Sequence, residues 1–250
     1  MKRLFRLSTV LYAAVVAVLA AVCFLFHTKT FSLWPGKLPR AYTDTREGGF
    51  STAKVSATDS AVSFEAVLHS GLYHPHAGVE FSLLDGFESF SEEGLDFSDM
   101  DSAVIEFRAT SDVVLVFYTK DPLATRPGDV LSLRPLRLDI PATRSYLEHR
   151  VSLSGLRPSA IWFDIHGLEQ DENLFLGDVF RVAVETGRGT LLGLPTELDI
   201  RKLEIFGENR VLIRTCLFIL ILTTVLYLWV CGKAWKTKRK QNPRANPPRT

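Results

Sequence analysis

Residues 101–119, DSAVIEFRATSDVVLVFYT, contain two consecutive patterns that are typical of β-strands. In the first, Ala103, Ile105 and Phe107 place an apolar side chain at every second position, which predicts a strand with one buried face. The second, Asp112–Thr119, is an apolar run about as long as one strand. Such a run is expected of a central strand that is buried on both faces.

Similar patterns continue on both sides of this segment, and no long helical stripe interrupts them between Phe50 and Phe206. Turn-forming residues such as Asp121-Pro122 and Arg126-Pro127-Gly128 separate them. The further candidate strands are Val62–Leu68, Val79–Leu83, Val130–Ile140, Ser145–Leu153, Ser159–Ile165, Asn173–Leu176 with Asp178–Glu185, and Leu198–Phe206. Short strands at this spacing predict an all-β, two-sheet sandwich of the jelly-roll type over residues 50–207.

Charge is divided unevenly along the chain, although the net charge is only +1. Residues 1–6 and 231–250 contain basic residues and no acidic ones, whereas all 28 Asp and Glu residues lie between His27 and Arg210. The middle of the chain is therefore acidic. An acidic domain lacks the basic surface that nucleic acid requires, so we do not expect a nucleic-acid partner.

Residues 7–26 and 211–230 are apolar runs that predict two transmembrane helices, because each is long enough to cross the hydrocarbon layer. A cleaved signal peptide is the alternative for the first run, but the run is longer than usual and holds no Ala-x-Ala site. A buried core helix is the alternative for the second. Aromatic and basic residues expected at the membrane interfaces are Trp34, Arg214, Tyr227, Trp229 and Trp235.

The basic flanks place both termini in the cytoplasm and the middle domain outside it, by the positive-inside rule. We therefore expect a cytoplasmic segment 1–6, a linker 27–49 and a basic cytoplasmic tail 231–250 around the helices and the sandwich. The middle domain contains no cysteine, and the chain contains no Asn-x-Ser/Thr acceptor. These features favour a bacterial inner-membrane protein with a periplasmic domain.

The connection between the last predicted strand and the second helix is short. LDIRKLEIFG ends at Gly207, and only Glu208, Asn209 and Arg210 precede the apolar run. A movement of the sandwich could therefore tilt or rotate the helix, which is a hypothesis for signal transfer across the membrane.

Four segments resemble galactose-binding-like and carbohydrate-binding-module jelly rolls, as found in the periplasmic parts of bacterial membrane sensors. They are GLYHPHAGVEFSL (71–83), GLDFSDMDSAVIEFRATSDVVLVFYT (94–119), YLEHRVSLSGLRPSAIWFDI (146–165) and LFLGDVFRVAVE (174–185). The resemblance implies sugar binding, a structural calcium ion in some members, and packing against protein partners in others. Sensor relatives often carry a cytoplasmic output domain after the second helix, and we do not expect the short tail 231–250 to form one.

Candidate ligand-binding residues are Tyr73, His74, His76, Trp162 and Asp164. Exposed aromatic rings can stack on a sugar, but core packing is the favoured alternative for Trp162. His74 and His76 would point to one side of an extended strand and could share a metal, but solvent-facing histidines fit the sequence as well. Acidic loops suit calcium, and a structural cation is placed near Asp178 as an alternative to a solvated loop.

Motifs for nucleophilic catalysis and for nucleotide binding are absent: there is no Gly-x-Ser-x-Gly, P-loop or GxGxxG, and no cysteine in the middle domain. We therefore expect no enzyme, with a glycan-active enzyme as the third-ranked reading. The first is a ligand-sensing or accessory subunit that signals through its membrane helices, with the bilayer, a glycan or envelope polymer and a membrane or cytoplasmic protein as partners. The second is a structural or assembly subunit of a cell-envelope complex.

Overall fold

The computed structural model describes residues 2–83 and 93–241, and it divides into two compact units. The β unit is Thr30–Gly207, and the helical unit consists of the segments on either side of it. Each unit is described separately below. The residues expected to carry acidic loop ligands at 85, 88 and 92 lie outside the described residues.

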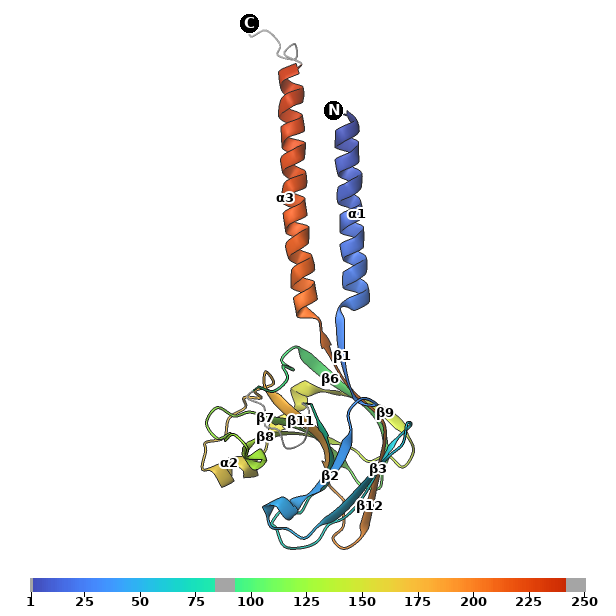
Figure 1. Ribbon diagram of the computed structural model, residues 1–250, viewed down its shortest axis with the longest axis vertical. Helices are drawn as coiled ribbons and strands as arrows, with labels where there is room; N and C mark the ends of the chain where they lie inside the picture. Colours follow the sequence, from blue (N-terminus) through green and yellow to red (C-terminus); the bar gives the residue numbers. More distant parts are fainter. Residues whose placement is uncertain (1, 84–92, 242–250) are drawn as a thin grey trace. The chain divides into compact units, whose positions relative to one another are not determined.

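The described part of the β unit forms two six-stranded sheets (Figure 1). The first sheet has the order β3-β4-β12-β6-β9, and β1 also pairs with β12; the second has the order β10-β8-β7-β11-β5-β2. The strands of the first sheet are β1 (Thr28–Trp34), β3 (Thr52–Ala57), β4 (Val62–Val67), β6 (Met100–Ala109), β9 (Leu147–Ser152) and β12 (Pro195–Glu208). Those of the second are β2 (Pro39–Thr43), β5 (Ala77–Ser82), β7 (Val113–Thr119), β8 (Arg134–Ile140), β10 (Arg157–Pro158) and β11 (Val179–Thr186).

The core lies between the two sheets and is built by the alternation that the sequence shows. Ile105 and Phe107 of β6 face it from the first sheet, and Leu115 and Phe117 of β7 face it from the second; all four are fully buried. The alternate residues of β7 point to the outer face of the second sheet, so β7 is buried on both faces. The prediction of a central strand at Asp112–Thr119 is therefore confirmed.

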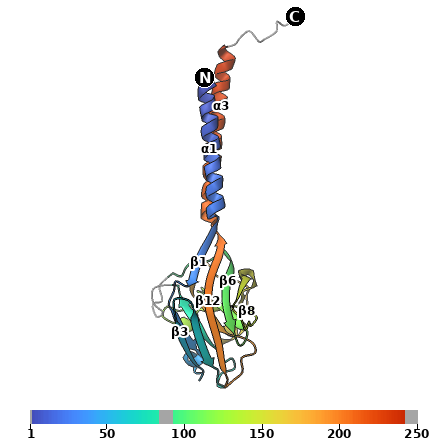
Figure 2. The same ribbon diagram turned by 90° about the vertical axis from the view of Figure 1, so that its right-hand side faces the viewer.

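Two strands lie in the segment 27–49 that the sequence predicted to be a linker. β1 adds to the first sheet beside β12 (Figure 2), β2 forms an edge of the second sheet, and the short helix η1 (Asp44–Glu47) follows. The linker prediction is wrong because these strands are short and their apolar residues do not form a long alternation. Trp34, expected at a membrane interface, packs in the core of the sandwich and is only 8% exposed.

The predicted strand Ser159–Ile165 is a helix, α2 (Ala160–His166), which lies beside β8 (Figure 1). The adjacent residues Trp162 and Phe163 of α2 are both buried. In a strand with one buried face only one of them could be buried, because successive side chains of a strand point to opposite faces. Gly167 adopts the left-handed conformation, with φ 65°, and its N–H bonds back to Asp164, which ends the helix. The short helix η2 (Val130–Ser132) replaces the beginning of the predicted strand Val130–Ile140. The short helix η3 (Leu153–Gly155) begins at the last residue of the predicted strand Ser145–Leu153. The predicted strand Asn173–Leu176 is an irregular segment.

The helical unit contains α1 (Lys2–Phe26) and α3 (Arg210–Gln241), which lie side by side (Figure 1). Residues 6–26 and 210–233 are long and apolar enough to cross a membrane, with mean hydropathy 2.6 and 2.3. The ring of Tyr12 stacks on that of Tyr227 at 4.6 Å between centroids, so Tyr227 joins the helix pair. The Cys216 thiol is hydrogen-bonded to that of Cys23 in the same pair.

The other residues expected at a membrane interface lie on α3. Arg214 and Trp229 are exposed, and the ammonium of Lys233 lies 3.7 Å from the centroid of the Trp229 ring. The side chain of Trp235 lies outside the described part of the chain. Their placement at an interface stays a prediction.

Candidate functional site

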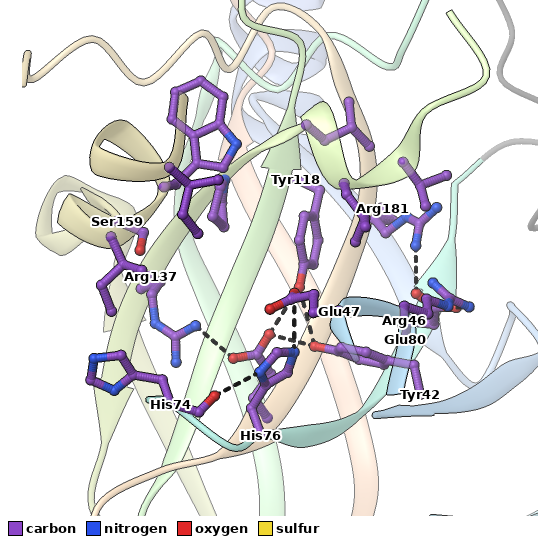
Figure 3. A pocket seen from close by; sticks show the side chains of 18 of the residues that line it. Tyr42, Arg46, Glu47, His74, His76, Glu80, Tyr118, Arg137, Ser159 and Arg181 are labelled. Carbon is purple, nitrogen blue, oxygen red and sulfur yellow. Dashed lines mark hydrogen bonds and ion pairs between the residues drawn. The ribbon is translucent and has the colours of Figure 1, made fainter. Parts of the chain in front are cut away.

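A cavity of about 460 Å³ lies on the outer face of the second sheet (Figure 3). This volume is within the range of about 300–1,000 Å³ that is usual for small-molecule sites. Five strands supply its floor, and η1, η2, α2 and the segment before β5 supply its walls. Its lining includes Tyr42, Glu80, Tyr118, Arg137, Arg181 and Glu185 on the strands, and Arg46, Glu47, His74, His76, Leu131, Ile161, Trp162, Ile165 and His166 on the walls.

The centre of the floor is a buried carboxylate, Glu185 of β11, which is 1% exposed. Its Oε1 accepts hydrogen bonds from the hydroxyls of Tyr42, at 2.5 Å, and Tyr118, at 2.9 Å. Its Oε2 forms an ion pair with a terminal guanidinium nitrogen of Arg137 at 2.7 Å. These four side chains come from four different strands. Tyr42, Tyr118 and Arg137 are labelled in Figure 3. The network therefore fixes the positions of these four side chains on the floor of the cavity.

Gly78 makes room for this arrangement. It lies between Tyr42 and Glu185 in the cross-strand register. A Cβ at position 78 would come within 2.8 Å of the Val184 carbonyl oxygen and 2.9 Å of the Tyr42 ring. Only glycine lets the Tyr42 ring cross β5 and place its hydroxyl on Glu185.

Electrostatics keep Glu185 ionised. Burial alone would raise the pKa of this carboxyl, but Arg137, His76 and the two tyrosine hydroxyls outweigh burial and hold the pKa below its ordinary value. The pKa of Tyr42 and that of Tyr118 are raised well above the ordinary value, first by burial and then by the charge of Glu185. Around Glu185, the floor thus contains one carboxylate anion and two neutral phenols at neutral pH.

The lowered pKa of Glu185 predicts acid sensitivity. Because the folded-state pKa lies below the unfolded one, the stabilisation is present above about pH 4.3 and is lost as the pH falls through the folded-state value. Glu185→Gln should cost about 1–3 kcal/mol at neutral pH, because it breaks a buried charged hydrogen-bond network. Urea unfolding at neutral and acidic pH measures both effects, and the difference between wild type and variant should shrink in acid. An unchanged difference at low pH would contradict this role of Glu185.

A second buried carboxylate, Glu80 of β5, lies beside the first and is also 1% exposed. Arg181 pairs with one of its oxygens at 2.7 Å, and Arg46 pairs with the other at 3.2 Å. Arg40 approaches the latter oxygen at 4.0 Å. The carboxylate therefore holds guanidinium groups in place along the floor of the cavity (Figure 3).

The wall formed by α2 and η2 is apolar where it faces the cavity. Leu131 is 43% exposed, Ile161 38% and Ile165 72%. Such large exposed aliphatic side chains around a polar floor are typical of a ligand site, in which apolar contacts accompany a few oriented polar groups.

Arg134 attaches α2 to the sheet. Its guanidinium is completely buried and pairs with Asp121 at 3.1 Å and with Asp171 at 2.6 Å. It also lies over the rings of Phe163 and Trp162, at 4.5 and 5.6 Å from their centroids. The position of the apolar wall therefore depends on this buried cation.

Three of the five residues expected to bind a ligand, His74, His76 and Trp162, line this cavity. Tyr73 and Asp164 do not line it: Tyr73 is 91% exposed against the edge of His74, and Asp164 is exposed on α2. The described residues contain no group of three or more potential metal ligands. A metal shared by His74 and His76 alone stays a prediction.

The carboxylate of Asp178, where a structural cation was expected, accepts a hydrogen bond from the Gly94 N–H and lies 3.8 Å from the Lys120 ammonium. Those contacts occupy both of its oxygens with protein groups. A calcium ion in this protein stays a prediction.

The residues that sequence reasoning missed are those of the floor: Tyr42, Glu80, Arg137, Arg181 and Glu185. One signal was available, because Glu80 and Glu185 are acids placed among apolar residues of predicted strands. A charged group at such a position must be paired when it is buried. Tyr42 gave no signal, since it lies in the segment interpreted as a linker.

No protein-family model and no curated protein matches the chain. Among solved structures, the family 11 carbohydrate-binding module of the cellulosomal cellulase Lic26A-Cel5E of Clostridium thermocellum is similar, with a TM-score of 0.50 and 14% identity over 73% of this chain and 95% of that module. The family 11 module from Clostridium thermocellum in complex with a β-1,3-1,4-mixed-linked tetrasaccharide gives the same TM-score and identity over 73% and 96%. The β unit of this chain therefore has the jelly-roll fold of carbohydrate-binding modules.

Proposed function

We propose that the β unit binds a saccharide in the cavity on the outer face of the second sheet, and that α1 and α3 anchor this unit in a membrane. The observation that carries the proposal is the cavity itself. It combines an apolar wall with polar groups that are fixed by buried hydrogen bonds and ion pairs. A saccharide needs both kinds of contact, because it presents apolar C–H faces and many hydroxyls.

The proposal is tested by saccharide binding to the full chain in detergent, measured by calorimetry or ligand-observed NMR. His74→Ala and Leu131→Ala remove exposed groups that line the cavity, and each should weaken binding about threefold to tenfold, which corresponds to about 0.6–1.4 kcal/mol. Leu123→Ala is the matched control, since Leu123 is 80% exposed in the same part of the chain and does not line the cavity. Equal losses in all three variants, or no binding to any saccharide, would count against the site.

We propose further that the protein is a two-span protein of a bacterial inner membrane, with both termini in the cytoplasm and the β unit in the periplasm. The apolar helices and the basic segments outside them support this orientation. In intact cells, a tag on either terminus should be inaccessible from outside, and protease added to spheroplasts should cut the β unit. A terminus that is labelled from outside would refute the orientation.

In this setting we propose a sensory or accessory role, in which saccharide binding alters the helix pair. Only Asn209 lies between the end of β12 and the start of α3, which leaves little chain to absorb a movement. Saccharide should change the rate at which an oxidant links Cys23 to Cys216, and a flexible Gly/Ser insertion at Asn209 should abolish that change. A rate that does not respond to saccharide in the wild type would refute the coupling.

A further inference from the structure

The accessible polar groups on the floor of the cavity are mainly cationic. The carboxylates of Glu80 and Glu185 lie beneath the surface, with 1% of each side chain exposed. The guanidiniums that pair with them extend outward: the Arg46 side chain is 30% exposed and that of Arg137 is 37% exposed. A ligand in the cavity therefore contacts guanidinium groups, while the compensating carboxylates are covered.

The charges of this floor do not cancel locally. Arg46 and Arg181 share the single carboxylate of Glu80, so that pair of guanidiniums carries one positive charge in excess. Arg181 is only one-tenth exposed, and low solvent access strengthens its electrostatic interactions. An anion bound beside Arg46 would neutralise this excess positive charge.

The remaining lining carboxylates, Glu47 and Asp129, belong to the wall, and the Glu47 side chain is 42% exposed. Glu47 lies 3.7 Å from the Nε2 atom of His76, and Asp129 accepts the Leu131 N–H at the start of η2. The exposed side chain of His74 also lines the cavity and is labelled in Figure 3. Groups that can donate hydrogen bonds to an anion thus surround much of the floor.

Open aromatic platforms, which suit a neutral sugar, contribute little to this lining. Tyr42 is 8% exposed and its hydroxyl is bound to Glu185; Trp162 is 5% exposed and stacks within its own helix on His166, at 4.4 Å between centroids. Affinity must then come more from charge and from the aliphatic wall than from ring stacking. Guanidinium groups are well suited to this, because they bind carboxylates with two parallel hydrogen bonds.

We infer that the saccharide taken by this cavity is acidic, with a uronate-type carboxylate bound by Arg46. This inference rests on the proposed function and specifies the ligand class for the same site. The carboxylate lies over the guanidiniums of the floor, and the C–H face of the sugar ring lies against Leu131, Ile161 and Ile165.

The test compares saccharides that differ only in a carboxylate: glucuronate with glucose, galacturonate with galactose, and the corresponding oligomers, with the full chain in detergent. At least one uronate should bind about tenfold or more tightly than its neutral counterpart, since a charged hydrogen bond contributes about 1.5–3 kcal/mol. This preference should decrease at high ionic strength, because salt screens charges that solvent reaches.

Arg46→Gln is the discriminating variant, because Glu80 keeps its closer partner Arg181 and the fold should be retained. It should reduce the preference for the uronate over its neutral counterpart about tenfold. Lys54→Gln is the matched control, since it removes one positive charge from an exposed residue of β3 in the other sheet. Thermal unfolding of each variant checks that the fold is intact.

The possible results distinguish a failure of this inference from a failure of the proposed saccharide binding. Uronate and neutral saccharides that bind equally well would overturn the acidic ligand while leaving saccharide binding in place, as would equal losses in the Arg46 and Lys54 variants. No binding to any member of the set would overturn the proposed function, and the inference with it. The wild-type comparison decides between these results without any variant.

Discussion

A fragment that begins at Lys37 should fail to fold, whereas a fragment from Thr28 to Glu208 should unfold cooperatively. The difference between them is β1, whose Leu33 is completely buried and whose Trp34 is 8% exposed in the core. Truncating a buried Leu costs about 2–5 kcal/mol, and truncating a buried Trp about 3–5 kcal/mol. Together these losses approach the whole stability of a typical domain, which is about 5–15 kcal/mol.

Urea unfolding followed by tryptophan fluorescence and near-UV circular dichroism measures this difference. Within the longer fragment, Leu33→Ala and Trp34→Ala should each lower the unfolding midpoint. Leu38→Ala should not, since Leu38 is 81% exposed just after β1. If the Lys37 fragment is as stable as the longer one, β1 is dispensable and residues 27–49 begin with a true linker.

The strands that the sequence predicted correctly share one property, which is an alternation set by the core alone. In β6, Ala103, Ile105 and Phe107 are all fully buried, and the pattern follows directly from packing against one opposing sheet. The same reasoning located most of β12. β7 was located instead by its continuous apolar run, which burial on both faces requires. Here local sequence and tertiary packing require the same conformation.

The predictions for α2 and β2 were wrong because a second layer covers the outer face of the second sheet there. Trp162 and Phe163 looked like neighbours in a strand, but both are buried beside Arg134, a contact between segments about thirty residues apart. Tyr42 became a site residue only because β2 pairs with β5 and Gly78 leaves space for its ring. Such information resides in strand order, which a single sequence does not contain.

The residues that line the cavity were partly predictable for a related reason. His74 and His76 were found because histidines are conspicuous in a sequence. Glu185 and Arg137 were missed because their significance depends on pairing across two strands, and neither residue is unusual alone. Charged residues inside apolar strands were the one available indication that paired charged side chains lie on the outer face of the second sheet.

Arg134→Met should cost about 3–5 kcal/mol of stability, the usual penalty for removing one partner of a buried ion pair. Asp121 is 3% exposed, so its carboxylate would remain buried without its cation. The methionine can replace part of the contact with Phe163, but it supplies no charge. Asp171 is better exposed and can be rehydrated. The loss should therefore come mainly from Asp121.

A second change tests that assignment. Arg134→Met combined with Asp121→Asn should recover part of the lost stability, because the buried group is then neutral. Arg144→Met is the control for charge, since Arg144 is exposed, and should leave the unfolding midpoint within about 0.5 kcal/mol of wild type. If the double variant is less stable than Arg134→Met alone, the cost does not arise from an uncompensated Asp121.

The same variant links stability to binding. Arg134 touches no ligand, but it holds Trp162 and Phe163 of α2, and α2 carries the apolar wall of the cavity. At temperatures where Arg134→Met is still folded, saccharide affinity should fall at least tenfold, because the wall is no longer held against the sheet. Calorimetric titration at a temperature below the unfolding transition measures this loss. Wild-type affinity in a folded Arg134→Met protein would show that α2 keeps its position without the buried cation, and that the cavity depends on the sheet alone.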